Sequence, residues 1–107
     1  MLPVFDSYGE AGATILLTST DIAQNLSAAV LTLSGKACRA GILTLEQNDI
    51  KVAFGGTVPV AAVGSVGHLL KKNLPLVAFV GTYAMSTLKY ISAVAGDHAT
   101  ITFTPFY

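Results

Sequence analysis

Thr100-Ile-Thr-Phe-Thr-Pro105, near the end of the chain, is the stretch that decides the fold, because polar and apolar residues alternate in it one by one. Successive side chains of a β-strand point to opposite faces of a sheet, so this period of two predicts a strand. Ile101 and Phe103 would face a core, whereas the threonines would cover the other face with hydroxyl groups. The preceding Gly96-Asp97 pair indicates a turn.

Further short runs rich in Thr, Val, Ile and Leu lie upstream, each bounded by turn-forming residues, and this composition favours strands over helices. The runs are Ala13–Ser19, Ala28–Ser34, Ala37–Glu46, Ile50–Phe54, His68–Lys71, Leu74–Val80 and Thr87–Ala93. Turn residues recur every 8 to 12 positions or so, which is roughly the spacing of sandwiches and barrels. The sequence therefore predicts an all-β fold, an antiparallel β-sandwich or small barrel of about eight strands.

Two connections between these runs carry expectations of their own. Glu46-Gln-Asn-Asp49 is a polar turn that leads into the alternating Ile50-Lys-Val-Ala-Phe54, which predicts a hairpin. Gly55–Gly67 is the longest irregular segment, with one possible helical turn at Ala61-Ala-Val63, and we expect it to cross between two sheets.

The first residues differ in character from the rest of the chain. They mix Pro3, Gly9 and Gly12 with two aromatic residues, which is poor material for a regular element. We therefore expect an extended N-terminal arm over residues 1–12 and one β-sandwich domain over residues 13–107. The start of the sequence lacks the basic and apolar regions of a secretory signal.

Charge is scarce in this chain. Only 11% of the residues are Asp, Glu, Lys or Arg, against about 25% in a typical soluble domain, and 52% are apolar. A lone compact domain would have few charges to solvate its outer faces, so we interpret part of its surface as covered by other protein. Six cations balance six carboxylates, which argues against binding of nucleic acid or of an acidic membrane. Val52–Leu70 is uncharged, but its glycines and Pro59 argue against a membrane-spanning helix.

The residue pattern does not favour catalysis. Ser65 lies three residues before His68, but no orienting group accompanies this pair. We interpret Cys38 as a buried packing residue. Ser86-Thr-Leu-Lys89 matches the Ser-x-x-Lys pattern of penicillin-interacting enzymes, but this segment favours a strand and the companion motifs are absent. We therefore expect no enzymatic activity, no cofactor and no metal, and we assign the scattered carboxylates to turns and solvent.

Five aromatic residues near the termini or in loops are candidate interface residues. They are Phe5, Tyr8, Tyr83, Phe106 and Tyr107. Aromatic side chains at such places anchor protein interfaces, but Phe and Tyr also dominate the burial of a protein's own core. Both interpretations stay open at the level of the sequence.

Several motifs resemble those of a group of small tailed-phage structural proteins. The matching segments are Ala37-Cys-Arg-Ala-Gly-Ile-Leu-Thr-Leu-Glu46, Asn48-Asp-Ile-Lys-Val52, Gly56-Thr-Val-Pro59, Gly64, Gly67-His-Leu-Leu70, Leu88-Lys-Tyr-Ile91 and Thr102-Phe-Thr-Pro-Phe106. The likeness covers about two-thirds of the chain and lies in pattern, not in any catalytic residue.

This resemblance implies a β-sandwich virion component. The function it implies is that of a capsid decoration, or cement, protein that stabilises the outer surface of a tailed-phage capsid as a homo-oligomer, with a trimer as one option. The partners would be the major capsid protein and further copies of the chain, on the capsid surface of the virion after synthesis in the host cytoplasm. The alternative is a tail or head-fibre component that binds a receptor or a carbohydrate.

Overall fold

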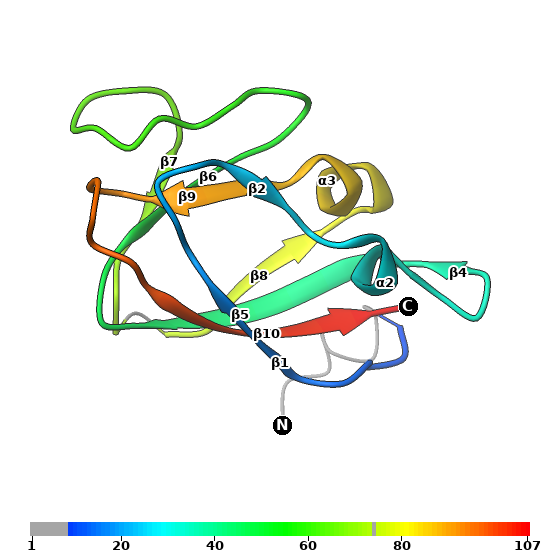
Figure 1. Cartoon of the computed structure of the whole chain (residues 1–107). Helices are drawn as coiled ribbons and strands as arrows, with labels where there is room; N and C mark the ends of the chain where they lie inside the picture. The colour runs from blue at the N-terminus through cyan, green and yellow to red at the C-terminus, as the bar shows by residue number, and fades with distance from the viewer. Residues whose placement is uncertain (1–8, 74) are drawn as a thin grey trace.

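Two four-stranded antiparallel sheets pack face to face in the computed structural model, which describes residues 9–73 and 75–107 (Figure 1). The first sheet has the order β1 (Ile15–Thr18), β10 (Thr100–Phe106), β5 (Ala40–Glu46) and β8 (Val77–Val80). The second sheet has the order β2 (Gln24–Asn25), β9 (Lys89–Ser92), β6 (Ile50–Ala53) and β7 (His68–Leu70). The predicted antiparallel β-sandwich is confirmed.

The chain is arranged as a ribbon bent at its middle, so that early strands pair with late ones. β1 pairs with β10, β2 with β9, β5 with β8, and β6 with β7, all antiparallel. The bend of the ribbon is the loop over residues 54–67, which we call the β6–β7 loop. Eight strands wound into two sheets in this way form a jelly roll.

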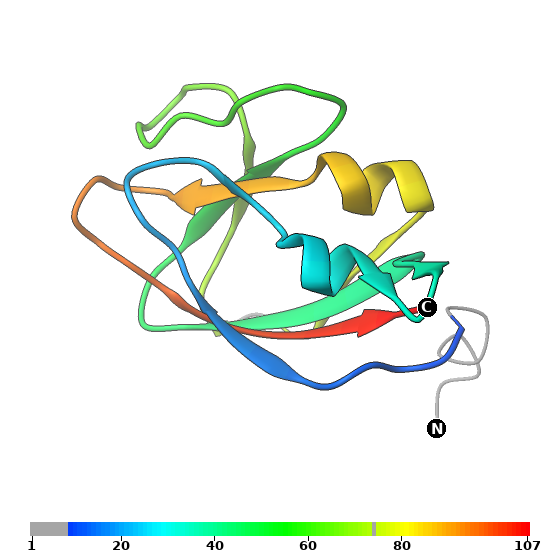
Figure 2. The same cartoon turned by 45° about the vertical axis from the view of Figure 1, so that its right-hand side comes forward.

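Three short elements complete the described fold. A small hairpin of β3 (Thr32–Leu33) and β4 (Lys36–Ala37) projects beside the C-terminal end of β10 (Figure 2). The two helices are α2 (Ala28–Leu31) and α3 (Thr82–Thr87).

The expectation of strands at both helices was wrong. In the run Ala28–Ser34, the Ser27 carbonyl accepts hydrogen bonds from the amides of Val30 and Leu31, so the alanine-rich start forms one helical turn and only Thr32–Leu33 is a strand. In Ser86-Thr-Leu-Lys89, the first two residues end α3. Their hydroxyls donate to the Tyr83 carbonyl. This carbonyl is thus hydrogen-bonded locally, whereas in a strand it would need a partner on a neighbouring strand.

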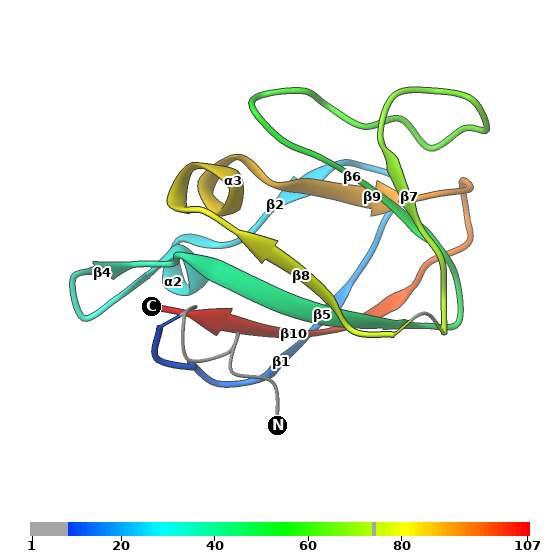
Figure 3. The same cartoon turned by 180° about the vertical axis from the view of Figure 1, so that it is seen from behind.

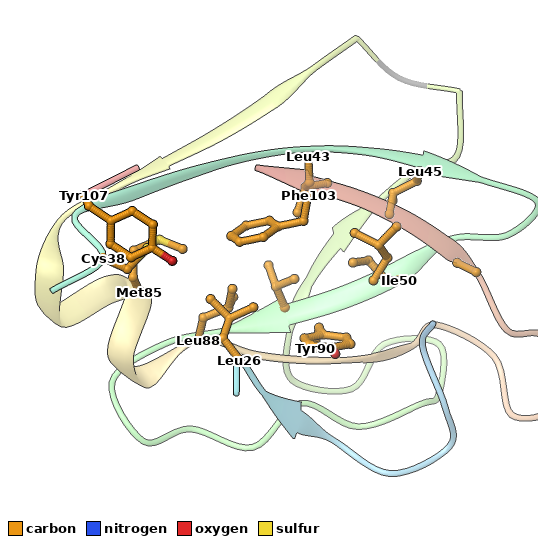
Figure 4. Packing of buried hydrophobic residues seen from close by; sticks show 13 residues of the cluster. Leu26, Cys38, Leu43, Leu45, Ile50, Met85, Leu88, Tyr90, Phe103 and Tyr107 are labelled. Carbon is orange, nitrogen blue, oxygen red and sulfur yellow. The ribbon is translucent and has the colours of Figure 1, made fainter. Parts of the chain in front are cut away.

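Both predicted connections were also wrong. The turn at 46–49 joins β5 of the first sheet to β6 of the second, so it links the two layers and closes no hairpin. The reason lies in the core, because Leu45 and Ile50 on either side of the turn are buried between the sheets (Figure 4). The β6–β7 loop, conversely, does not cross between sheets, because it returns to a strand that pairs with β6.

The core lies between the two sheets and combines inward side chains from both (Figure 4). Ile101 and Phe103 of β10 are almost fully buried, whereas Thr100, Thr102 and Thr104 point outward, as the alternation predicts. Burial of a side chain as large as Phe103 contributes about 2–3 kcal/mol. The core cluster consists of Leu26, Cys38, Leu43, Leu45, Ile50, Val52, Met85, Leu88, Tyr90, Ala99, Ile101, Phe103 and Tyr107.

Candidate functional site

The outer face of the first sheet carries almost no charge. The four strands of this sheet contain a single charged residue, Glu46, which is the last residue of β5. We call this surface the threonine face and define it by the outward side chains that are exposed or half-buried, which are Leu16, Thr18, Ile42, Thr44, Glu46, Ala78, Val80, Thr100, Thr102 and Thr104. It is one continuous surface across four strands.

Hydroxyl and apolar side chains are mixed on the threonine face. Leu16, Thr102 and Thr44 lie side by side in one row, because the register pairs each with the next. Leu16 is 72% exposed and Val80 is 63% exposed, although both are aliphatic. Hydroxyl groups both donate and accept hydrogen bonds, so this face can contact another protein without the cost of burying an unpaired charge. Such a surface suits binding.

The outer face of the second sheet is covered by the protein's own β6–β7 loop, which lies above β6 and β7 on the side away from the first sheet (Figures 1 and 3). Lys51 of β6 is at the centre of this cover and is only 5% exposed. Its Nζ atom donates to the Ala62 carbonyl at 2.5 Å, the Ser65 carbonyl at 3.1 Å and the Ser65 hydroxyl at 2.9 Å. The buried ammonium group thereby fixes the loop to the sheet.

Sequence reasoning did not find this role of Lys51. A lysine at an outward position of a strand ordinarily lies in solvent. The long uncharged segment that follows Lys51, with its glycines, valines and Pro59, could have indicated this role. Backbone carbonyl groups of such a segment need hydrogen-bond donors wherever they are buried. Ser65 therefore pairs with Lys51, and not with the His68 considered from the sequence.

A hollow of about 320 Å³ lies beside the covered face. It is lined by Asp49, Lys51, Val63, Gly64, Ser65, Gly67, Leu69, Ala93 and Val94. Val63 is 96% exposed and stands at its margin. The Ser65 hydroxyl also lies 2.8 Å from the Val60 carbonyl. Because its contacts are with loop carbonyls and Lys51, this serine serves the loop's structure and is not placed as a nucleophile.

The candidate interface residues divide into three groups. Tyr83, at the start of α3, is 71% exposed. Phe106 and Tyr107 are buried, the first in a small second cluster with Ala40 and the second in the main core. The Tyr107 hydroxyl donates to the Val30 carbonyl. Tyr107 thus belongs to the protein's own core, which was one of the two interpretations. Phe106 is buried on the outward side of β10, the side of Thr104, where Ile42 packs against its cluster.

The remaining two candidates, Phe5 and Tyr8, lie outside the described residues. The described end of the expected arm lies along β10. Ala11 forms a β-bridge with Phe106, and Glu10 exchanges two backbone hydrogen bonds with Tyr107. The chain therefore already lies on the sandwich at these positions.

The reactive side chains have structural roles. Cys38 is buried, as predicted, and its thiol donates to the Ala40 carbonyl at 3.2 Å. Burial raises the pKa of this thiol, so it is a poor nucleophile. Asp21 accepts a hydrogen bond from the Gly96 amide at 2.8 Å and lies 3.3 Å from His98. The Gly96 hydrogen bond, with a smaller effect of His98, lowers the pKa of Asp21.

Within the described ranges, no cluster of three or more His, Cys, Asp and Glu side chains is placed to hold a metal ion. The helices of the described chain are too short to span a bilayer. Comparison of the chain with family models, with curated proteins and with solved structures finds no match.

Proposed function

We propose that this chain is a virion structural protein of the decoration type, which binds the outer surface of a tailed-phage capsid as a homo-oligomer. The observation that carries the proposal is the threonine face, a surface across four strands whose single charged residue is Glu46. The sequence motifs that resemble small tailed-phage structural proteins support it. The jelly roll is compatible with it, because viral capsid domains are among the proteins that use this fold, although the fold alone defines no function.

In this proposal the threonine face is the surface that meets the shell. Specific contacts between proteins bury about 800 Å² on each partner, and the Cα atoms of this sandwich extend over 36 × 29 × 19 Å, so one broad face is of suitable size. Each contact would be weak on its own. Repetition over a capsid lattice, and linkage of several copies in one oligomer, would convert weak contacts into stable attachment.

A binding assay with empty capsids that lack this protein tests the proposal. We expect saturable binding with a copy number comparable to that of the shell subunits. Thr102→Lys places a charge at the middle of the threonine face and is expected to weaken binding at least about tenfold, because burial of an unpaired ammonium costs more than 1.4 kcal/mol. Thr57→Lys changes an exposed threonine in the β6–β7 loop and is the matched control.

Two results would contradict the proposal. The first is wild-type protein that does not bind capsids at any concentration. The second is equal weakening by the two lysine variants, which would mean that attachment does not use the threonine face.

The alternative is a receptor- or carbohydrate-binding component of a tail or head fibre. The hollow beside the β6–β7 loop favours it, because Asp49 offers a carboxylate next to the apolar Leu69 and Val94. A specific hit on a glycan array that is lost in Asp49→Asn would support this alternative. A copy number of only a handful per virion would also support it.

A further inference from the structure

The two edge strands of the first sheet lack the features that usually prevent a sheet edge from pairing with another chain. These features are charged residues, prolines, bulges and very short strands. β1 has the sequence Ile-Leu-Leu-Thr and β8 has the sequence Val-Ala-Phe-Val, four residues each with no charge and no proline. No strand lies beyond either of them in the part of the chain that the structure describes.

The second sheet is different. Its edge strand β2 has two residues, and its edge strand β7 has three and is followed directly by Lys71 and Lys72. These edges are short, and one ends beside two charges, as is usual for edges that stay unpaired. The exposed edges of the first sheet are therefore a specific property of that sheet.

Inward side chains of the first sheet are less buried on its edge strands than on its central strands. On the central strands, the inward residues Leu43 and Phe103 are fully buried. On both edge strands the inward residues are only partly buried, although they pack against the same core. These residues are Ile15, Leu17, Val77 and Phe79. A further strand beyond each edge would remove this apolar surface from water.

The directions of the strands determine how two copies can meet. β1 is antiparallel to β10, β10 to β5, and β5 to β8, so β8 runs antiparallel to β1. A second copy placed beside the first in the same orientation thus presents its β1 antiparallel to β8. The combined sheet would be antiparallel throughout.

We infer that β8 of one copy pairs with β1 of a second copy, so that the first sheets continue from copy to copy. This inference rests on the self-association in the proposed function and names the surfaces that make it. With Leu16 opposite Ala78, Ile15 meets Phe79 and Leu17 meets Val77, which joins the four half-buried residues in two inward pairs. Because the contact joins two different edges, its repetition closes a ring when the rotation between neighbouring copies is a whole fraction of a full turn, and the threonine face stays available to the shell.

Cysteine cross-linking tests this pairing. Leu16→Cys and Ala78→Cys place thiols at two exposed positions, and the native Cys38 is buried in every variant. A mixture of the two single variants is expected to form a disulfide-linked dimer, since opposite Cβ atoms in an antiparallel pair lie about 4.5–5.5 Å apart. A dimer formed by either variant alone would show that like edges pair, and it would overturn the inference.

Light scattering without any capsid gives an independent measurement. We expect wild-type protein to form an oligomer of one defined mass, and Val77→Lys to raise the concentration needed for assembly at least tenfold, because an inward lysine at an edge blocks strand addition. Circular dichroism checks that this variant is folded. Thr102→Lys, away from the edges, is expected to keep the oligomer.

Two outcomes of this measurement would overturn edge pairing. One is wild-type protein that stays monomeric at high concentration, and the other is an oligomer that survives Val77→Lys but is lost in Thr102→Lys. Attachment to the shell is measured separately in the capsid assay, so failure of the inference and failure of the proposed function are distinguishable.

Discussion

The two outer faces of this sandwich differ in what completes them. The first sheet exposes a row of threonines and aliphatic side chains, whereas the second sheet is covered by a loop of the same chain that closes on Lys51. Both sheets contribute to one core, so the difference does not arise from the interior. A single buried ammonium group gives the loop carbonyls a donor on one face, and the other face has no such group. The comparison shows that the protein covers one outer face with its own loop, whereas threonine and aliphatic side chains of the other face stay at the surface.

Among substitutions that test this difference between the two faces, Lys51→Met is expected to have the largest effect on stability. It keeps a long side chain but removes the ammonium group. The Ser65 carbonyl and hydroxyl would lose this donor, and the Ala62 carbonyl would keep only the Ser65 hydroxyl, so the free energy of unfolding is expected to fall by about 3 kcal/mol. Urea denaturation measures the loss, and hydrogen exchange at residues 60–66 should show that the loop opens.

Lys89→Met is the matched control for this prediction. The Lys89 ammonium donates to the Asn25 side chain at 2.8 Å at an exposed site, so its loss is expected to cost less than about 1 kcal/mol. Similar losses in both variants would contradict a special role for Lys51.

A smaller effect is expected from Gly67→Ala, which tests how closely the loop approaches the second sheet. Gly67 has φ +131°, and an added Cβ would lie 3.1 Å from the Cβ atoms of Lys51 and Pro59. Backbone strain and this contact together are expected to cost about 2 kcal/mol in urea denaturation. Gly64→Ala, at φ +75° with no neighbour within 4 Å, is the control and should cost about 1 kcal/mol. A larger loss in the control would contradict the close approach.

The opposite face should tolerate change. Thr44→Lys on the threonine face is expected to alter the free energy of unfolding by less than about 0.5 kcal/mol, because the new ammonium group can reach water. The same variant should bind empty capsids at least tenfold more weakly. A large loss of stability would mean that this face is packed by the chain itself, and it would remove the contrast between the two faces.

The smallest effect concerns the rim, where Asp21 joins the loop after β1 to the loop before β10. Its pKa lies below the ordinary value of 3.8, mainly because the Gly96 amide donates to the carboxylate. The charged form is favoured in the folded state, so this contribution to stability is present above the ordinary pKa and is lost as the pH falls through the lower, folded value.

Urea midpoints measured between about pH 5 and pH 3 should show this loss in the wild type and less of it in Asp21→Asn. Equal pH dependence in both proteins would assign the effect to other carboxylates. The hydrogen bond of Asp21 joins two loops and lies on neither outer face of the sandwich. Asp21→Asn should therefore change neither hydrogen exchange in the β6–β7 loop nor binding by the threonine face.

The sequence was a good guide to the class of fold and a poor one to its connections. Alternation in Thr100–Pro105 and the regular turn spacing are local properties; the first predicts its strand correctly, and the second predicts most strands but misses the two helices. The turn at 46–49 has the local sequence of a hairpin, but β5 and β6 enter different sheets. Local sequence does not determine whether two successive strands pair with each other or join different sheets. That choice depends on β10, which pairs with β5 from far along the chain.

The candidate surface was predictable only in outline. The scarcity of charge indicates a covered surface, but it does not say which face is covered by the protein itself. Lys51 decides that, and its partners Ala62 and Ser65 come together only in the folded loop. Phe106 and Tyr107 were ambiguous for a similar reason, since burial depends on what neighbours β10.

The place of β10 in the first sheet has a consequence for biosynthesis. This strand is the last of the described strands to leave the ribosome, yet it lies between β1 and β5. Until residues 100–106 emerge, β5 can pair only with β8, and β1 has no neighbour to which it can bond. Folding must therefore wait until translation has passed this strand, and the joining of such distant segments makes it slow.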